Sequence, residues 1–172
     1  MIRFIEVTEK TFDKVYNKMM AAFPHEERRD CYDEKECIKN DKFKLFEIYD
    51  GETEVGFTAL WVFNNFVFIE HIAVDQNKRG GGYGSKAIEH IKELYNKPII
   101  LEAEAPVTEQ QIKRIKFYER LGFKVNDYDY MQPSYHGGEC VPLMILSYPE
   151  LLSQNQFDLF LSETRREVYK IK

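Results

Sequence analysis

The segment from Gly80 to Gly84 contains four glycines and constrains this 172-residue chain more than any other feature. It follows an apolar run at 66–74 that is typical of a buried strand, and it leads into helically spaced apolar residues over 82–96. A glycine costs a helix about 1 kcal/mol relative to alanine. Several glycines at a helix start therefore indicate that a ligand approaches the backbone where a Cβ would obstruct it. Free N–H groups and the helix dipole at this end favour an anion, typically a phosphate.

Other readings of the glycine-rich segment are a ligand-free turn, a P-loop and a dinucleotide site. A structural turn needs only one or two glycines, and no Gly-Lys-Ser/Thr sequence ends the segment as a P-loop requires. Residues 82–87 fit the dinucleotide pattern GxGxxA, and Glu102 follows at the end of the next predicted strand. In a dinucleotide fold, however, the glycines follow their strand almost directly, whereas Asp75 to Gly81 intervene here. We therefore interpret the dinucleotide match as a coincidence.

The pattern along the chain predicts an α/β protein with a mixed, largely antiparallel central sheet flanked by helices. Asp50-Gly51 is a hairpin signal between two strands of an antiparallel meander. We expect an N-terminal domain over 1–150 and an amphipathic helix within 151–172 that packs on this domain or on a partner subunit. The predicted elements are strand 2–8, helix 9–21, a short helix ending near Asn40, strands 43–49, 54–63 and 66–74, helix 82–96, strand 98–103, helix 108–121, strands near 123–130 and 141–148, and the C-terminal helix.

Composition argues against several functional classes. A net charge of −5 without a Lys/Arg run disfavours nucleic acid as a partner and is better suited to a cationic substrate. Three scattered cysteines without a CxxC, together with dispersed histidines, predict neither a disulfide framework nor a metal site. No apolar run approaches ~18 residues, and the first residues lack the apolar core of a signal peptide. We expect a soluble, cytoplasmic protein without a membrane partner.

Two motifs in order resemble those of the GCN5-related N-acetyltransferase (GNAT) family. Arg79-Gly80-Gly81-Gly82-Tyr83-Gly84 matches the family pattern Arg/Gln-x-x-Gly-x-Gly/Ala, and a hydrophobic strand ending in Ala73-Val74-Asp75 precedes it. Phe117-Tyr118-Glu119-Arg120-Leu121-Gly122-Phe123 matches the Tyr-x-x-x-Gly-Phe segment that the family keeps one strand and one helix later. The resemblance covers about residues 2–148.

The resemblance implies the GNAT fold and acetyl-CoA as co-substrate. In this family acetyl-CoA lies where the fourth strand (66–74) and the fifth strand (98–103) splay apart. Seven residues before its tyrosine the family often has Asn, whereas this chain has Gln111. This departure affects the expected contacts to the coenzyme tail. The implied cofactor-binding residues are the backbone of Ile72, Ala73 and Val74 for the pantetheine arm, the amides of Arg79, Gly80, Gly81, Gly82, Tyr83, Gly84 and Ser85 for the pyrophosphate, and Gln111 and Tyr118.

Acetyl transfer to an amine needs a base, a polarised carbonyl and an acid. We expect Glu70 to be the base, since regular alternation puts it on the same strand face as Val74, four residues later. His71, on the opposite face, and a water are the other candidates. The Val74 N–H would polarise the thioester carbonyl. Tyr118, at the position of the family's tyrosine, would protonate the departing thiolate.

The predicted function is therefore an N-acetyltransferase. It would move an acetyl group to a primary amine of a small molecule or peptide by direct transfer through a tetrahedral intermediate. The acceptor site would include His25–Glu34 and Tyr128–Glu139, although a solvated charge run also explains the acidic residues of the first segment. A CoA-binding sensor or scaffold of the same fold and a dinucleotide-dependent oxidoreductase are the alternatives. The acceptor, the acyl-chain specificity and a possible homodimer stay open.

Overall fold

Antiparallel hairpins build the sheet in the first part of the chain. In the computed structural model, which describes residues 1–171, strands β1 (Ile2–Glu6), β2 (Phe43–Asp50), β3 (Thr53–Val62) and β4 (Val67–Val74) pair antiparallel in chain order. Gly51 lies in the predicted turn between β2 and β3 with a φ of +61°, a conformation that glycine adopts without a Cβ penalty. The predicted meander is confirmed.

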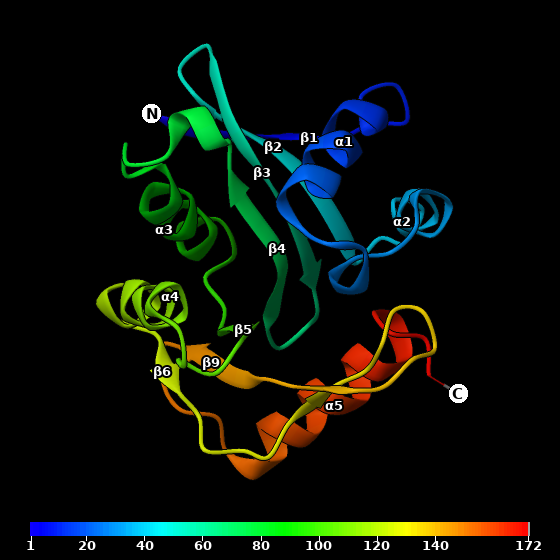
Figure 1. Ribbon diagram of the computed structural model, residues 1–172, viewed down its shortest axis with the longest axis vertical. Coiled ribbons are helices and arrows are strands. Elements are labelled where there is room, and N and C mark those ends of the chain that lie inside the picture. The colour runs from blue at the N-terminus through cyan, green and yellow to red at the C-terminus, as the bar shows by residue number, and fades with distance from the viewer. Residues whose placement is uncertain (172) are drawn as a thin grey trace. The chain divides into compact units, whose positions relative to one another are not determined.

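Helices cover both faces of this sheet (Figure 1). Helix α3 (Tyr83–Tyr95) lies on one face, and α1 (Phe12–Ala22) and α2 (Cys31–Cys37) lie on the other. Two 3₁₀ turns, η1 (His25–Glu27) and η2 (Gln76–Lys78), complete this part. On the α3 face, Ile48, Val55 and Ala87 form a buried cluster against which Ile72 packs. On the other face, α1 buries Phe12, Val15, Tyr16 and Met19. These elements belong to one compact unit, Met1–Lys97.

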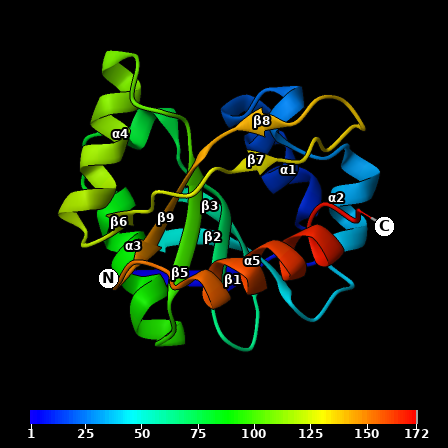
Figure 2. The same cartoon turned by 90° about the horizontal axis from the view of Figure 1, so that it is seen from below.

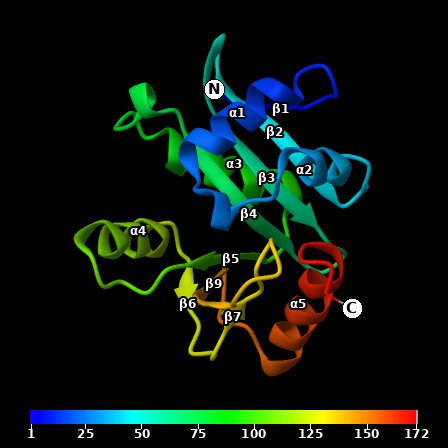
Figure 3. The same cartoon turned by 45° about the vertical axis from the view of Figure 1, so that its right-hand side comes forward.

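A second compact unit begins at Pro98. Its sheet places β9 (Met144–Tyr148) antiparallel between β5 (Ile99–Ala103) and β6 (Lys124–Val125), and β5 and β9 can be followed in Figure 3. Strands β7 (Met131–Gln132) and β8 (Val141–Pro142) form a separate short antiparallel pair (Figure 2). Helix α4 (Glu109–Arg120) lies between β5 and β6 in sequence. The predicted α/β class with mostly antiparallel strands is confirmed.

The predicted strand at 123–130 is wrong beyond Val125. The side chain of Asn126 is buried; its amide donates to Ser147 Oγ at 2.8 Å, and its Oδ1 accepts from the Leu152 N–H at 2.8 Å. The Asn126 N–H still donates to the Ile145 carbonyl of β9 at 2.9 Å, and β6 itself ends at Val125. The predicted strand at 141–148 is interrupted as well, because the Leu143 N–H turns to the Tyr130 carbonyl at 3.2 Å.

Helix α5 (Gln154–Glu167) packs its apolar side on its own unit. Phe157 stacks on Tyr128 with ring centroids 4.0 Å apart, and Phe160 is fully buried near Tyr130. A capping box between Ser153 and Gln156 starts the helix. Among residues 1–171, none of the helices combines the length and apolar character that crossing a membrane requires.

Candidate functional site

The glycine-rich turn presents the N-terminal end of α3. Gly80 and Gly82 have φ values of +84° and +73°, in the left-handed region that glycine favours. Gly82 is the N-cap, and within residues 1–171 no side chain caps this end. The N–H groups in the first turn of a helix have no acceptor within that helix. Those of Tyr83, Gly84 and Ser85 therefore suit an anionic ligand.

Glycine occupies the three consecutive positions 80, 81 and 82 for different physical reasons. A Cβ on Gly81 would lie 2.7 Å from Cε2 of Tyr83, so a larger residue there would force that ring to shift. A Cβ on Gly80 or Gly82 would meet nothing within 4 Å. Only the backbone conformation requires glycine at these two positions, and the space beside them is open to a ligand. This open space favours a ligand site over a purely structural turn.

The chain entering this turn is held firmly by β3 and α1. A Cβ on Gly56 would lie 2.1 Å from the Ala73 carbonyl oxygen, so β3 and β4 approach closely here. The Asp75 N–H donates to the Val55 carbonyl at 2.8 Å. The Asp75 carboxylate accepts from Lys18 Nζ of α1 at 2.7 Å. The end of β4 is thereby fixed before the glycines begin.

Glu70 occupies a β-bulge in β4. Ala59 pairs with His71 and the next residue, Leu60, pairs with Ile69, so Glu70 is the extra residue on its strand. A bulge bends the strand and re-aims its side chains, and bulges are frequent next to active sites. Regular alternation therefore does not hold at Glu70.

Because of the bulge, Glu70 and His71 contact the same segment of chain. The Glu70 carboxylate accepts from Arg29 Nη2 at 2.7 Å and from Trp61 Nε1 at 2.8 Å. His71 Nε2 donates to the Glu27 carbonyl at 2.8 Å. Arg29 and Glu27 lie two residues apart between α1 and α2. The expectation that Glu70 and His71 face opposite sides of the strand is therefore wrong.

The surroundings of Glu70 make it a weak proton acceptor. Burial by itself raises the pKa of Glu70, but the charges of Arg29 and His71 and the hydrogen bonds from Arg29 and Trp61 outweigh burial, so the pKa lies below its ordinary value. The side chain is 1% exposed, and donors occupy both oxygens. Sequence reasoning missed Arg29 because it lies in a charged run that is typical of a solvated loop.

Gln111 caps α4. Its Oε1 accepts from the N–H groups of Val107 and Thr108 at 3.1 and 2.9 Å, and its Nε2 donates to Glu104 at 2.6 Å. Thr108 Oγ1 accepts from the Gln111 N–H in return, which completes a capping box. The Thr-x-x-Gln spacing is the sequence signal for this role. The contact of Gln111 with the coenzyme stays a prediction.

Tyr118 lies half-buried near the C-terminal end of α4. Its ring packs on Phe117 and Phe123, with centroids 5.1 and 5.6 Å away. Gly122, with a φ of +86°, follows the helix in a left-handed conformation that glycine favours. Burial raises the pKa of Tyr118, although the charge of Arg114 opposes this. The phenol therefore stays protonated at neutral pH and is able to donate its proton.

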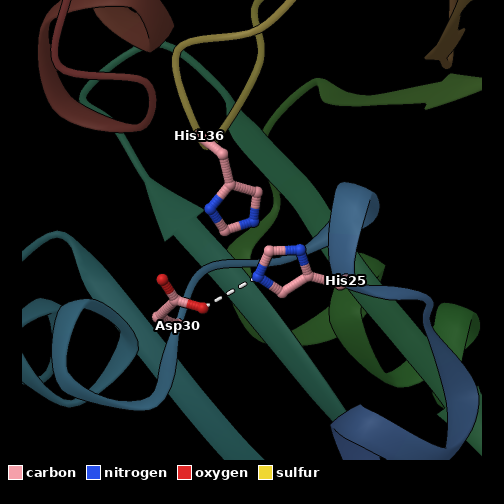
Figure 4. A group of neighbouring side chains, drawn as sticks. All are labelled: His25, Asp30 and His136. Atoms are coloured by element: carbon pink, nitrogen blue, oxygen red, sulfur yellow. Dashed lines mark hydrogen bonds and ion pairs between the residues drawn. The ribbon is translucent and has the colours of Figure 1, made fainter.

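The two predicted acceptor segments are more ordered than solvated loops. His25 Nε2 lies 3.0 Å from Asp30 Oδ1, and both side chains are exposed (Figure 4). Glu34, by contrast, is fully buried. In the other segment, the Tyr128 hydroxyl donates to the Leu152 carbonyl at 2.8 Å, while His136 is exposed in the connection between β7 and β8 (Figure 4).

Comparisons with known proteins identify the kind of protein this chain is similar to. The model of the acetyltransferase (GNAT) family matches residues 12–123. YjbC of Bacillus subtilis (strain 168), named as an acetyltransferase, is 28% identical over 162 residues, covering 91% of this chain and 82% of that protein. A solved structure from Bacteroides thetaiotaomicron, named as a GNAT-family acetyltransferase, is 31% identical with a TM-score of 0.92 and covers 99% of both chains. A solved aminoglycoside 6'-N-acetyltransferase complexed with coenzyme A is 15% identical, has a TM-score of 0.60, covers 86% of this chain and 95% of its own, and shows the same fold.

Proposed function

This chain belongs to the acetyltransferase (GNAT) family, and from that premise we propose that it transfers an acetyl group from acetyl-CoA to a primary amine of a small molecule or peptide. The N-terminal end of α3 carries the proposal. Its uncapped amides and the open space beside Gly80 and Gly82 suit the pyrophosphate of a coenzyme. A solved structural neighbour contains coenzyme A, which supports the same co-substrate here.

The residues fit acetyl-CoA in two parts of the first unit. The amides from Arg79 to Ser85 would hold the pyrophosphate, and the backbone from Ile72 to Val74 would hold the pantetheine arm. The Val74 N–H would polarise the thioester carbonyl. Gly56, together with the bond from the Asp75 N–H to Val55, supports this arrangement because both fix the end of β4 in advance.

The reaction would be direct. The amine nitrogen attacks the carbonyl carbon of the thioester, the carbon–sulfur bond breaks, and the sulfur takes the phenolic proton of Tyr118. The amine loses one proton to solvent. Solvent then returns a proton to the Tyr118 phenolate. Arg29 and Trp61 occupy the Glu70 carboxylate. Of the three candidates for the base, we therefore favour water.

Binding of acetyl-CoA tests the anion site at α3. We expect micromolar binding by isothermal titration calorimetry, no binding of NADH, and at least tenfold weaker binding of acetyl-CoA to Gly82→Ala, roughly 1.4 kcal/mol. Gly51→Ala is a matched control, since Gly51 also has a positive φ of +61° and an open Cβ position. Equal binding by the two variants, or no acetyl-CoA binding by the wild type, would contradict the proposal.

Turnover tests the acetyl transfer itself. The structural neighbours are named for spermidine, aminoglycoside and peptide-conjugate chemistry, so a panel of spermidine, kanamycin and a short peptide with a free N-terminus samples the amine classes. The net charge of −5 favours the cationic members. We expect thiol release with at least one amine. Tight acetyl-CoA binding without turnover on any of them would instead support a CoA-binding sensor.

A further inference from the structure

Two buried carboxyl groups share one guanidinium beside β4. Arg29 Nη1 donates to Glu34 Oε2 at 2.9 Å, and Arg29 Nη2 donates to Glu70 Oε1 at 2.7 Å. The side chains of Glu34, Glu70 and Arg29 are 0%, 1% and 5% exposed. With both carboxyl groups ionised, two negative charges would share the single guanidinium of Arg29, shielded from bulk solvent. Burial makes such an excess charge costly.

The hydrogen bonds distinguish the two carboxyl groups. Both oxygens of Glu70 accept from donors, since Arg29 reaches each of them and Trp61 Nε1 also reaches Oε2. Glu34 Oε1 is buried, and among residues 1–171 it has no hydrogen-bond partner. An ionised oxygen without a donor is the more expensive of the two to bury. The proton therefore belongs on Glu34.

Within residues 1–171, Arg29 is the one cation in hydrogen-bond contact with Glu34. From β4, the charge of His71 also acts on Glu34, while the His71 Nε2 donates to the Glu27 carbonyl. From α1, the Tyr16 hydroxyl donates to the Arg29 carbonyl at 2.9 Å and accepts from Arg28. Burial and the charge of Glu70 raise the pKa of Glu34, and the charges of Arg29 and His71 and the hydrogen bond from Arg29 oppose this only in part.

We propose that Glu34 keeps its proton at neutral pH, so that Glu34, Arg29 and Glu70 form a buried unit without net charge that positions segment 23–30 on β4. Arg29 is the positioning residue at one end of this segment, held by Glu70 through its side chain and by Tyr16 through its carbonyl. Glu27 is the second attachment, through His71. Segment 23–30 overlaps the predicted acceptor segment, and its link to amine binding rests on the proposed function. The protonation of the Glu34–Arg29–Glu70 triad does not.

The proposal fixes the sign of a pH dependence. The pKa of Glu34 is higher in the folded than in the unfolded chain, where it is near 4.5. Its favourable contribution to folding is therefore complete below about pH 4.5 and is lost as pH rises through the folded value. Glu34→Gln mimics the protonated acid and removes this loss. At alkaline pH the variant should be as stable as the wild type or more stable.

Urea unfolding of the full chain at about pH 5.5 and about pH 8 tests the triad. Trp61 is the only tryptophan and donates to Glu70, so its fluorescence reports on the cluster directly. We expect Glu34→Gln to leave the native fluorescence unchanged and to keep or raise the urea midpoint, most at the higher pH. Glu70→Gln should lower the midpoint and shift the fluorescence. Glu34→Gln/Glu70→Gln should lose more than the sum of the single variants, because in Glu70→Gln the Glu34 carboxyl can still ionise beside Arg29, whereas in the double variant Arg29 is buried without either carboxylate.

The two single variants test whether Glu34 is protonated even if the double variant does not fold. A midpoint for Glu34→Gln at about pH 8 that falls as far as that of Glu70→Gln would show that Glu34 is ionised and would overturn the proposal. Strictly additive losses in a folded double variant would overturn it too. Acetyl-CoA titration of the same proteins is independent of both results: no binding by the wild type would count against acetyl transfer alone.

Discussion

At the scale of single residues, one extra residue in β4 decides which chemistry its side chains can perform. The rule of alternation places Glu70 and His71 on opposite faces, but the bulge turns both toward the segment between α1 and α2. The bulge follows from the pairing of β4 with β3, which a single strand does not reveal. The glycine-rich turn was predictable because the residues that form it are consecutive. Arg29 was not, because its partners are 5 and 41 positions away.

The role of the Tyr118 hydroxyl as proton donor can be tested by a single substitution. Tyr118→Phe keeps the ring that packs on Phe117 and Phe123 but removes the proton donor. We expect kcat to fall about 100-fold or more, with acetyl-CoA affinity unchanged in calorimetry. Burial raises the pKa of Tyr118 above its ordinary 10.0, so the acid stays protonated to higher pH. The alkaline decline of wild-type kcat that Tyr118 causes should therefore have its midpoint above pH 10.

Tyr95→Phe is the matched control for this substitution. Tyr95 is a partly buried phenol on α3 whose pKa burial raises to about 12, yet no role in transfer is proposed for it. Its loss should leave kcat within about twofold of the wild type, because the phenol has no part in the proposed transfer. Equal losses in the two variants, or full turnover by Tyr118→Phe, would remove Tyr118 from the mechanism.

At the scale of elements, helix α1 contacts the chain that enters the glycine-rich turn, the proposed site of acetyl-CoA. Lys18 bridges Glu54 of β3, at 2.8 Å, and Asp75, at 2.7 Å, and Asp75 is the residue between β4 and η2. The sequence predicted α3 and α4 to within about one residue, because helical spacing and the Thr108 cap are local signals. It did not predict that α1 reaches Asp75, since 57 positions separate the two residues.

Lys18→Met tests whether this contact pre-organises the turn. Losing this partly buried ion pair costs up to about 1 kcal/mol, so we expect acetyl-CoA binding to weaken roughly threefold to fivefold. Lys18→Arg should restore most of the affinity. Lys14→Met is the control, because Lys14 pairs with Glu47 and Glu54 of the same network but not with Asp75. Wild-type affinity in Lys18→Met, or equal weakening in Lys14→Met, would show that Asp75 needs no support from α1.

At the scale of the whole molecule, the order of elements and the mostly antiparallel pairing were readable from the sequence. Both depend on short-range signals, such as hairpin turns, apolar periodicity and glycine caps, repeated along the chain. The short strands β6, β7 and β8 were not readable, because each has two residues and is too short to show an apolar periodicity. The domain boundary at residue 150 stays a prediction. The apolar side of α5 has a partner within its own unit, in Tyr128 and Tyr130.

A substitution at Phe160 tests whether the packing of α5 on its own unit stabilises the single chain. Phe160 is fully buried, with Tyr130 and Phe157 as ring neighbours at 5.9 and 6.4 Å. Phe160→Ala should lower the free energy of unfolding by about 3–5 kcal/mol. Leu151→Ala, at a residue 58% exposed, should stay within about 0.5 kcal/mol of the wild type. Because the partners of α5 lie in its own chain, the urea midpoint of the wild type should not change over roughly a hundredfold range of protein concentration. A midpoint that rises with concentration, together with a small effect of Phe160→Ala at low concentration, would mean instead that α5 gains its stability from a second subunit.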